Sequence, residues 1–430
     1  MNIENLYAMY LRSQTVSTDT RNIPMKSIFF ALKGNNFNGN KFAKQAIESG
    51  ALFAIVDEKE YADESEDIHY VEDTLNALQK LAEFHREKLT IPIIALTGSN
   101  GKTTTKELIT AVLSKRYNVA STIGNLNNHI GVPLTLLSIH PNHEIAIVEM
   151  GANHQMEIDF LSKIAKPDFG YITNFGKAHL EGFGGEEGVI KGKSELYDYL
   201  KKNEKTVFVN CDDKKQVELT EGIRKITFGS DPKAEFSFKF SKSINGDCPE
   251  IIYDSTHFKS QLTGDYNQSN VAAAIAIGLK FEVPIEDIKA AIEEYIPDNN
   301  RSQIIHQNDL KIILDAYNAN PSSMQAALLN FSKMKGDKAI ILGDMFELGD
   351  AAAKEHQAII DLAEKLEFQT IFLIGKFFHQ IAVNYKNIRS FENRETAEKY
   401  FSENPIQEKQ LLIKGSRGMA LEKLLEIFSS

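Results

Sequence analysis

One short stretch of the sequence combines glycines, a lysine and threonines between an apolar run and a helical pattern. In IIALTGSNGKTTTKE, the residues Gly98, Gly101, Lys102 and Thr103 follow the apolar run IIAL and precede KELITAVLSKRY. Glycines let backbone amides turn toward a phosphate, a helix N-terminus adds positive potential, the lysine reaches terminal phosphates and the threonine hydroxyl binds Mg²⁺. The spacing departs from G-x-x-x-x-G-K-[ST], because Leu96 stands five residues before Gly101. We predict a nucleotide site, and the alternative is a glycine-rich turn without a ligand.

Two other polar residues follow apolar runs and are candidates for binding a metal ion beside the phosphates. Glu149 ends the run EIAIVEM, so its carboxylate is expected at the carboxyl edge of a parallel sheet, where nucleotides and their Mg²⁺ bind. His179 lies in the glycine-rich loop FGKAHLEGFGG, after the run FGYITN. The alternatives are a solvated glutamate and a structural histidine, which is the commoner use of a lone histidine.

Lys193 is predicted to lie on the apolar face of a helix. It shares the spacing i, i+3, i+4 and i+7 with Leu196, Tyr197 and Leu200. The opposite side is expected to carry Lys191, Glu195 and Asp198. A buried lysine needs a partner or loses its charge. It can extend to solvent, which is the commoner case, or it can be neutral enough to be modified, for example by CO₂ to a carbamate.

Short apolar runs alternate with helical patterns along the chain and would position these residues. The runs include ALFAIVDE, PIIALTG, EIAIVEMGAN, FGYITNFG, KIILDAYNAN, AIILGDM, TIFLIGK and LLIKGS. This alternation predicts an α/β fold with parallel sheets and crossover helices. A first break is expected in ALQKLAEFHREKLT and a second in the turn-rich YIPDNNRSQ, which gives domains at 1–85, 86–297 and 298–430.

The bulk composition excludes several kinds of partner. The chain has 430 residues, of which 42% are hydrophobic, and its formal net charge is -11. This charge disfavours nucleic acid and anionic membrane surfaces, whereas a local nest of amides and lysines can still hold a nucleotide. The two cysteines, Cys211 and Cys248, support neither a disulfide framework nor a zinc site. Because the N-terminus lacks a signal-peptide pattern and no run is long enough to span a membrane, we expect a cytoplasmic protein without a membrane partner, and nothing demands more than a monomer.

Seven longer strings carry a resemblance to a known family. They are TGSNGKTTTKE, GNLNNHIGVPLTLL, VEMGAN, NFGKAHLEGFG, DAYNANPSSMQAAL, LGDMFELG and KGSRGM. Together they resemble the ATP-dependent Mur ligases of peptidoglycan precursor synthesis, over all three domains. NLNNHIGVPLTLL, YNANPSSM and LGDMFELG are most similar to the branch that adds D-alanyl-D-alanine (D-Ala-D-Ala) to UDP-N-acetylmuramoyl-tripeptide (UDP-MurNAc-tripeptide) through an acyl phosphate. The resemblance implies a small α/β UDP-substrate domain, a central P-loop ATPase domain with a mainly parallel sheet, and a C-terminal Rossmann-like α/β domain.

The resemblance also implies roles for individual residues. ATP would be held by Gly98, Ser99, Asn100, Gly101, Lys102, Thr103, Thr104, Asn270, Arg301 and Asp315. Two Mg²⁺ sites would involve Thr103, Glu149, His179 and Lys193 as a carbamate. The catalytic set would be Lys102, Lys193, Glu149 and His179. The UDP-linked substrate would contact Thr20, Arg21, Lys33, Gly34, Asn127 and Asn128. The dipeptide pocket would be lined by Asn318, Asn320 and Ser322.

Three positions depart from the family pattern, and two other functions remain open. Thr20 stands where serine is usual, Asp315 is alone where an acidic pair is common, and Gly185 replaces a frequent serine. A folylpolyglutamate synthase would share the phosphate loop but not the UDP-sugar segment STDTRNIPMKSIFFALKGNNFNG, and a non-ligase P-loop ATPase would not need Lys193 or YNANPSS. The third residue of the tripeptide can be lysine or diaminopimelate. A hinge at Pro297–Arg301 would let the third domain close over the nucleotide.

Overall fold

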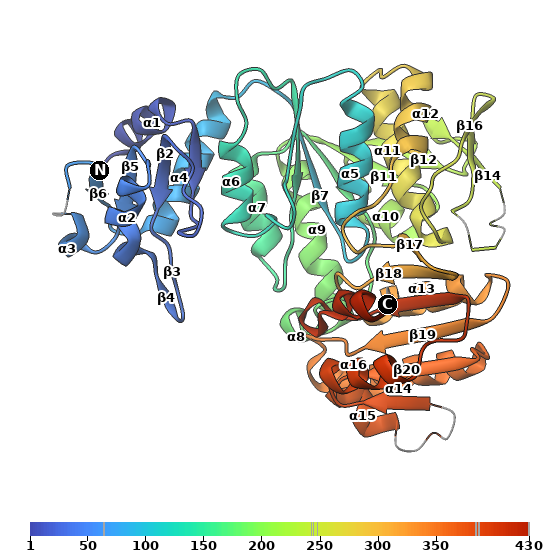
Figure 1. The fold of residues 1–430 in the computed structure, drawn as a ribbon. Coiled ribbons are helices and arrows are strands. Elements are labelled where there is room, and N and C mark those ends of the chain that lie inside the picture. The colour runs from blue at the N-terminus through green and yellow to red at the C-terminus, as the bar shows by residue number, and fades with distance from the viewer. Residues whose placement is uncertain are drawn as a thin grey trace.

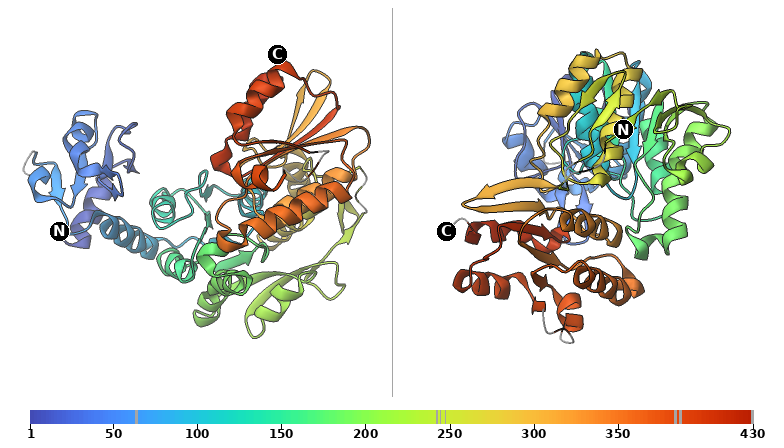
Figure 2. Two further views of the ribbon diagram at one scale, coloured as in Figure 1. Left: turned by 90° about the horizontal axis from the view of Figure 1, so that it is seen from below. Right: turned by 90° about the vertical axis from the view of Figure 1, so that its right-hand side faces the viewer.

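The protein is represented by a computed structural model that describes residues 1–62, 65–241, 243, 245–246, 248–382, 385 and 388–428. Three α/β units follow one another along the chain, and each is built around its own large sheet (Figure 1). The first unit lies at one end of the molecule, whereas the second and third units lie against each other. Figure 2 shows that helix α4 (Thr74–Lys88) leads from the first unit into the second.

The first unit contains a four-stranded parallel sheet in the order β1-β2-β5-β6 and a short hairpin of β3 and β4. Its strands are β1 (Thr15–Ser17), β2 (Ser27–Phe30), β3 (Lys33–Gly34), β4 (Phe37–Asn38), β5 (Phe53–Val56) and β6 (Ile68–Tyr70), and its helices are α1 (Ile3–Arg12), α2 (Ala43–Glu48), α3 (Lys59–Ala62) and α4. Successive residues of β2 and β5 enter two different apolar clusters, one on each face of the sheet. Both faces are therefore covered, as expected for parallel strands.

Helix α4 packs on both of the first two units. Near its end, Arg86 donates through Nε to the carbonyl oxygen of Ala165 at 2.9 Å and through Nη2 to Asp168 at 2.9 Å. In α1, the hydroxyl of Tyr10 donates to the carbonyl oxygen of Leu137 at 2.9 Å. The sequence suggested a domain break between residues 85 and 86, but α4 continues through this position. Its residue Arg86 bonds to the second unit.

The second unit has a seven-stranded, wholly parallel sheet in the order β13-β12-β11-β10-β7-β9-β8. Its strands are β7 (Ile93–Thr97), β8 (Val119–Ser121), β9 (Ile145–Glu149), β10 (Phe169–Ile172), β11 (Thr206–Asn210), β12 (Arg224–Gly229) and β13 (Phe236–Ser237). Its helices are α5 (Lys102–Leu113), α6 (Gly131–Leu137), α7 (Glu157–Ala165), α8 (Leu180–Phe183), α9 (Glu186–Lys202), α10 (Lys214–Leu219), α11 (Gln268–Lys280) and α12 (Ile285–Glu294). A small antiparallel sheet of β14 (Lys239–Phe240), β15 (Ile251–Tyr253) and β16 (Thr256–Phe258) is added, and these strands are too short to give a sequence pattern.

The third unit has a six-stranded sheet in the order β17-β18-β22-β19-β20-β21, in which only β17 is antiparallel to its neighbour. Its strands are β17 (Gln303–Gln307), β18 (Leu310–Asp315), β19 (Lys338–Gly343), β20 (Thr370–Ile374), β21 (Ile388–Phe391) and β22 (Gln410–Lys414), and its helices are α13 (Pro321–Ser332), α14 (Ala352–Lys365), α15 (Lys376–Ala382), α16 (Arg394–Glu403) and α17 (Leu425–Phe428). The predicted α/β class with a parallel central sheet is confirmed. Among the helices of the described residues, none has the length and apolar character that a membrane span requires.

Candidate active site

The phosphate loop connects β7 to α5 at the carboxyl edge of the second sheet. Its glycines have left-handed conformations, with φ +142° at Gly98 and +77° at Gly101. A Cβ on Gly98 would lie 2.0 Å from the hydroxyl oxygen of Thr173, and a Cβ on Gly101 would lie 2.6 Å from Oδ1 of Asn270. Both positions therefore require glycine. Helix α5 begins at Lys102, directly after the loop, so its N-terminus faces the space where phosphates would bind.

Glu149 ends β9, and two side chains hold its carboxylate. Thr103 donates through Oγ1 to Oε2 at 2.9 Å, and Asn127 donates through Nδ2 to Oε1 at 2.8 Å. The backbone N–H of Glu149 donates to the hydroxyl of Thr122 at 2.9 Å. These bonds fix a nearly fully buried carboxylate beside the Thr103 hydroxyl. Adjacent carboxylate and hydroxyl oxygens are hard ligands of the kind that Mg²⁺ takes.

The ammonium of Lys102 folds back over the phosphate loop. Its Nζ donates to the carbonyl oxygen of Gly98 at 2.7 Å. Burial lowers the pKa of Lys102; Glu149 opposes this shift and the positive charge of Arg301 adds to it. A phosphate in the loop would favour the charged lysine again, because a nearby anion stabilises an ammonium.

Lys193 lies on the buried face of α9, as the spacing predicts, and its side chain is fully buried. Its Nζ donates to the carbonyl oxygen of Ala152 at 3.1 Å and lies 5.0 Å from the centroid of the Phe183 ring. Burial moves the pKa of Lys193 well below its usual value, and the charge of Lys102 lowers it further, against Glu157 and Glu195. Among the described residues, no ion pair joins Lys193 to an acid, so its neutral form is favoured.

Glu195, which was predicted on the side of α9 opposite to Lys193, is not exposed there. Its carboxylate is buried and accepts hydrogen bonds from the backbone N–H groups of Met156 at 2.6 Å and Asp159 at 3.0 Å. These groups lie at the beginning of α7, where free N–H donors and the helix dipole stabilise a carboxylate. A helical-face argument counts only the neighbours on one helix and cannot detect such a partner.

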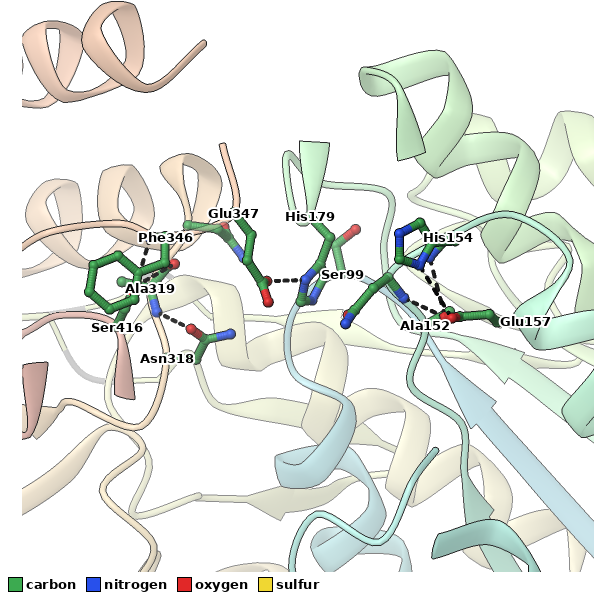
Figure 3. A network of polar contacts seen from close by, with 12 residues as sticks. Ser99, Ala152, His154, Glu157, His179, Asn318, Ala319, Phe346, Glu347 and Ser416 are labelled. Carbon is green, nitrogen blue, oxygen red and sulfur yellow. Dashed lines mark hydrogen bonds and ion pairs between the residues drawn. The ribbon is translucent and has the colours of Figure 1, made fainter. Parts of the chain in front are cut away.

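His179 faces the third unit. Its Nδ1 forms an ion pair with Glu347, which lies in the loop after β19 (Figure 3). The hydrogen bond from His179 lowers the pKa of Glu347. Figure 3 also shows a second acidic residue, Glu157, whose carboxylate accepts a hydrogen bond from the backbone N–H of Asn153 at 2.7 Å. In this arrangement Nδ1 of His179, which the sequence proposed as a metal ligand, is already paired with the carboxylate of Glu347.

The third unit is docked on the phosphate loop. Asn320 donates through Nδ2 to Oδ1 of Asn100 at 2.7 Å. Ser322 accepts the backbone N–H of Lys177 through its hydroxyl at 2.8 Å. Asn320 is also the N-cap of α13, with a capping box that includes Ser323. One residue proposed for the dipeptide pocket, Asn320, is thus bonded directly to a residue proposed for ATP, Asn100.

Two arginines lie over one tyrosine ring at the wall formed by the third unit. The guanidinium carbon of Arg301 is 3.8 Å from the centroid of Tyr317, and that of Arg417 is 4.8 Å from it. Neither arginine has an acidic partner within the described part of the chain, and Nη1 of Arg301 is buried without a hydrogen-bond acceptor. By contrast, Lys414 pairs with Asp315 at 2.5 Å.

These groups surround a cavity of about 710 Å³ between the second and third units. The candidates that line it are Ser99, Asn100, Gly101, Lys102, Thr103, Thr104, Asn127, Asn128, Glu149, His179, Asn270, Arg301, Asp315, Asn318, Asn320 and Ser322. Gly98 and Lys193 do not line it, and neither do the first-unit candidates Thr20, Arg21, Lys33 and Gly34. In the first unit, Arg21 pairs with Asp19 at 2.8 Å and Lys33 with Asp57 at 3.0 Å.

Several residues at the cavity were not selected from the sequence. They are Tyr266, Asn267, Tyr317, Phe346, Glu347, Lys414 and Arg417. Asn267 could have been selected from the sequence, because it precedes Asn270 by about one helical turn. In the structure its side-chain amide donates to the carbonyl oxygen of Thr263. Within the described ranges, no group of three or more His, Cys, Asp or Glu side chains is arranged to hold a metal ion.

Comparison with known proteins covers nearly the whole chain. Family models match in chain order: "Mur ligase family, catalytic domain" at residues 13–86, "Mur ligase middle domain" at 96–278 and "Mur ligase, glutamate ligase domain" at 300–417. A relative from Bacillus subtilis, named UDP-N-acetylmuramoyl-tripeptide–D-alanyl-D-alanine ligase, is 34% identical over 422 residues, which are 96% of this chain and 92% of that protein.

Solved structures show a similarity that also covers nearly the whole chain. A crystal structure of MurF from Acinetobacter baumannii is 31% identical, with a TM-score of 0.86 over 100% of this chain and 99% of that chain. A MurF ligase from Thermotoga maritima in complex with ADP is 25% identical, with a TM-score of 0.83 over 98% of each chain. The similarity therefore extends over all three units.

Proposed function

This chain belongs to the Mur ligase family, and we propose that it joins D-Ala-D-Ala to UDP-MurNAc-tripeptide in peptidoglycan precursor synthesis. It is an ATP-dependent ligase whose products are the UDP-linked pentapeptide, ADP and phosphate. The observation that carries this function is the full-length similarity to relatives of that activity. The cavity supports it, because the phosphate loop meets side chains of the third unit there.

The reaction requires activation because a carboxylate is a poor electrophile. The γ-phosphoryl group of ATP is transferred to the terminal carboxylate of the tripeptide, which gives an acyl phosphate and ADP. The amine of the dipeptide then attacks the acyl carbon, loses a proton, and the tetrahedral intermediate releases phosphate. The first step brings two anions together and the second places negative charge on the acyl oxygen, so the site must supply positive charge where negative charge develops.

Two side chains and one helix N-terminus are suited to that task. Lys102 would release the carbonyl oxygen of Gly98 and donate to the terminal phosphates of ATP. Arg301 has a buried nitrogen without an acceptor and lines the same cavity, so we assign it to the phosphates as well. The N-terminal amides of α5 would bind the remaining phosphate oxygens.

Mg²⁺ fits the pair of oxygens from Glu149 and Thr103. They lie 2.9 Å apart and both residues line the cavity. A bound Mg²⁺ would neutralise phosphate charge during transfer. We propose His179 for a second metal site, and Glu347 would then have to give up its ion pair with the histidine.

We further propose that Lys193 is carbamylated. A fully buried lysine without an acidic partner is held as the neutral amine, which adds to CO₂ with loss of one proton. The carbamate would carry negative charge toward the second metal site. The ¹³C NMR spectrum after addition of labelled bicarbonate should show a carbamate carbon that is absent from Lys193→Ala. A short carboxylic acid should partly restore the activity of that variant, and a wild-type spectrum without the signal would refute the proposal.

The three segments would divide the substrates among them. We propose that residues 1–85 bind the UDP end of one substrate, 86–297 bind ATP, and 298–430 bind the dipeptide and cover the nucleotide. We propose that the protein acts as a monomer. The supply of ATP supports a cytoplasmic location.

Phosphate release tests the function directly. The purified protein with ATP and Mg²⁺ should release phosphate only when UDP-MurNAc-tripeptide and D-Ala-D-Ala are both present, and single amino acids should not replace the dipeptide. Substrates with lysine or diaminopimelate as the third residue would identify the natural tripeptide. Release without either acceptor or UDP-substrate would indicate a non-ligase ATPase instead.

A further inference from the structure

One positively charged side chain at the cavity has no acidic partner among the described residues and no assigned role. The lysine and arginine residues that line the cavity are Lys102, Arg301, Lys414 and Arg417. Lys102 bonds to the phosphate loop and Lys414 pairs with Asp315. Arg301 has a buried nitrogen without an acceptor among the described residues and is assigned above to the ATP phosphates. Arg417 remains as a positive charge that no acid neutralises among the described residues.

The surroundings of Arg417 place it beside the predicted dipeptide pocket. The neighbouring Ser416 accepts the backbone N–H of Phe346 at 3.0 Å, and its hydroxyl lies 3.5 Å from the carbonyl oxygen of Ala319 (Figure 3). Lys414 donates to the carbonyl oxygen of Asn318 at 3.4 Å. The loop with Arg417 therefore packs between the loop after β18 and the loop after β19.

This corner of the cavity also offers the right mixture of surfaces for a small zwitterionic peptide. Phe346 exposes part of its ring to the cavity, which gives an apolar wall for methyl groups. A Cβ on Gly418 would lie 2.8 Å from the ring of Phe346, so glycine is needed beside Arg417 for that ring to pack. The Tyr317 ring supports the guanidinium plane of Arg417 from one side.

We propose that Arg417 binds the terminal carboxylate of the acceptor dipeptide and so selects an acceptor with a free carboxyl end. A carboxylate that enters the cavity loses water and needs a cation in return. A guanidinium matches it with two parallel N–H donors. With its carboxylate at Arg417, the dipeptide has its amine at the other end, free to attack the acyl phosphate. This inference rests on the proposed function, since it names the residue that recognises the second substrate.

Removal of the carboxylate and of the arginine, singly and together, tests the contact. Phosphate release is measured for wild type and Arg417→Gln with D-Ala-D-Ala and with D-alanyl-D-alaninamide, which lacks the terminal charge. A charge-assisted pair predicts a loss of about tenfold to hundredfold in kcat/KM for Arg417→Gln with D-Ala-D-Ala. With the amide, wild type and Arg417→Gln should differ less than about twofold, because the partner of the arginine is already gone.

Three controls separate this role from others. Lys423→Gln removes an exposed charge from the following helical turn and should leave every constant unchanged. Arg417→Lys should restore part of the loss, because it keeps the charge without the paired donors. The KM values for ATP and UDP-MurNAc-tripeptide should stay within about twofold in Arg417→Gln, and its Tm should equal that of wild type.

Two results would overturn the assignment. An equal loss with both acceptors would show that Arg417 does not contact the carboxylate, and a raised KM for ATP alone would assign it to the nucleotide. A failure of the proposed function is distinguishable from these, because wild type itself would then release phosphate independently of any acceptor.

Discussion

Replacement of Lys193 by methionine is expected to make the protein more stable and nearly inactive. The lysine is fully buried, and its hydrogen bond to the carbonyl oxygen of Ala152 is 3.1 Å long. Apolar replacements of buried charged groups stabilise proteins by about 1 to 4 kcal/mol, because the desolvation cost disappears. Methionine has the same unbranched shape and adapts to the space that remains.

The expected gain follows from two opposing contributions. From about 3 kcal/mol for the cost of burying the lysine amine, which gives up its proton on folding, we subtract about 1 kcal/mol for the Ala152 carbonyl, which loses its donor. The net gain of about 2 kcal/mol corresponds to a rise in Tm of about 4 to 8 °C for a unit of this size. Turnover should fall at least about hundredfold, as it does when a preorganised charge is removed from an active site.

The stability that Lys193→Met gains over wild type should depend on pH. Burial lowers the pKa of Lys193 well below its usual value, so the folded state binds fewer protons at this residue than the unfolded state. Wild-type stability at this residue therefore rises with pH. The advantage of Lys193→Met should be largest at low pH and should disappear above the unfolded-state lysine pKa of about 10.4.

The assay is thermal unfolding in CO₂-depleted buffer over a range of pH, together with phosphate release. Lys191→Met is the matched control, because Lys191 is exposed on the same helix and should change neither quantity. A lower Tm for Lys193→Met would show that the ammonium stabilises the fold, which would refute the burial argument. Wild-type turnover in Lys193→Met would remove Lys193 from the reaction.

Three further changes test contacts around the cavity. Tyr295→Phe removes the 2.5 Å hydrogen bond to Glu107, which holds the segment before Arg301 against α5. The KM for ATP should therefore rise about threefold or more, and an unchanged KM would show that this segment does not contribute to nucleotide binding. Asn127→Ala removes one of the two donors to the Glu149 carboxylate, so the Mg²⁺ concentration for half-maximal phosphate release should rise about tenfold, and a wild-type requirement would contradict the metal assignment. Asn320→Ala removes a helix N-cap and a contact to the phosphate loop, so urea unfolding should show a loss of about 1 kcal/mol, whereas equal stability would mean that water replaces both bonds.

The sequence was sufficient for the fold class and for the residues at the strand ends. Apolar runs such as IIALT and IAIVE are buried along their whole length, which gives a strong signal for parallel strands. Gly98 follows the first strand directly, Lys102 follows it after a short loop and Glu149 ends the second, so correct strands place them at one edge of the sheet. The position of Lys193 on a buried helix face was likewise predictable, because the residues that share this face recur at helical spacing within one helix.

Contacts between units could not be predicted in the same way. His179 and Glu347 are far apart in the chain and meet only because the third unit is docked. Arg417 and Tyr317 both belong to the third unit, but they too are far apart in the chain, and their contact depends on the pairing of β18 with β22. For the first unit, local motifs indicate a UDP-sugar segment, but they do not determine how far Lys33 lies from the cavity. In Figure 1 that unit lies at the opposite end of the molecule from the third.

The arrangement of charges at the cavity favours a ligand that carries both signs. Lys102 and Glu149 both line the cavity, yet the lysine bonds to the carbonyl oxygen of Gly98 and the glutamate is held by neutral donors. If these two charges formed an ion pair, a ligand would have to break that pair before it could bind. Because neutral groups hold them apart, each charge remains available to a partner from outside. A nucleotide phosphate for the lysine and a divalent cation for the glutamate would satisfy both groups at once, and only hydrogen bonds to neutral groups would have to be exchanged.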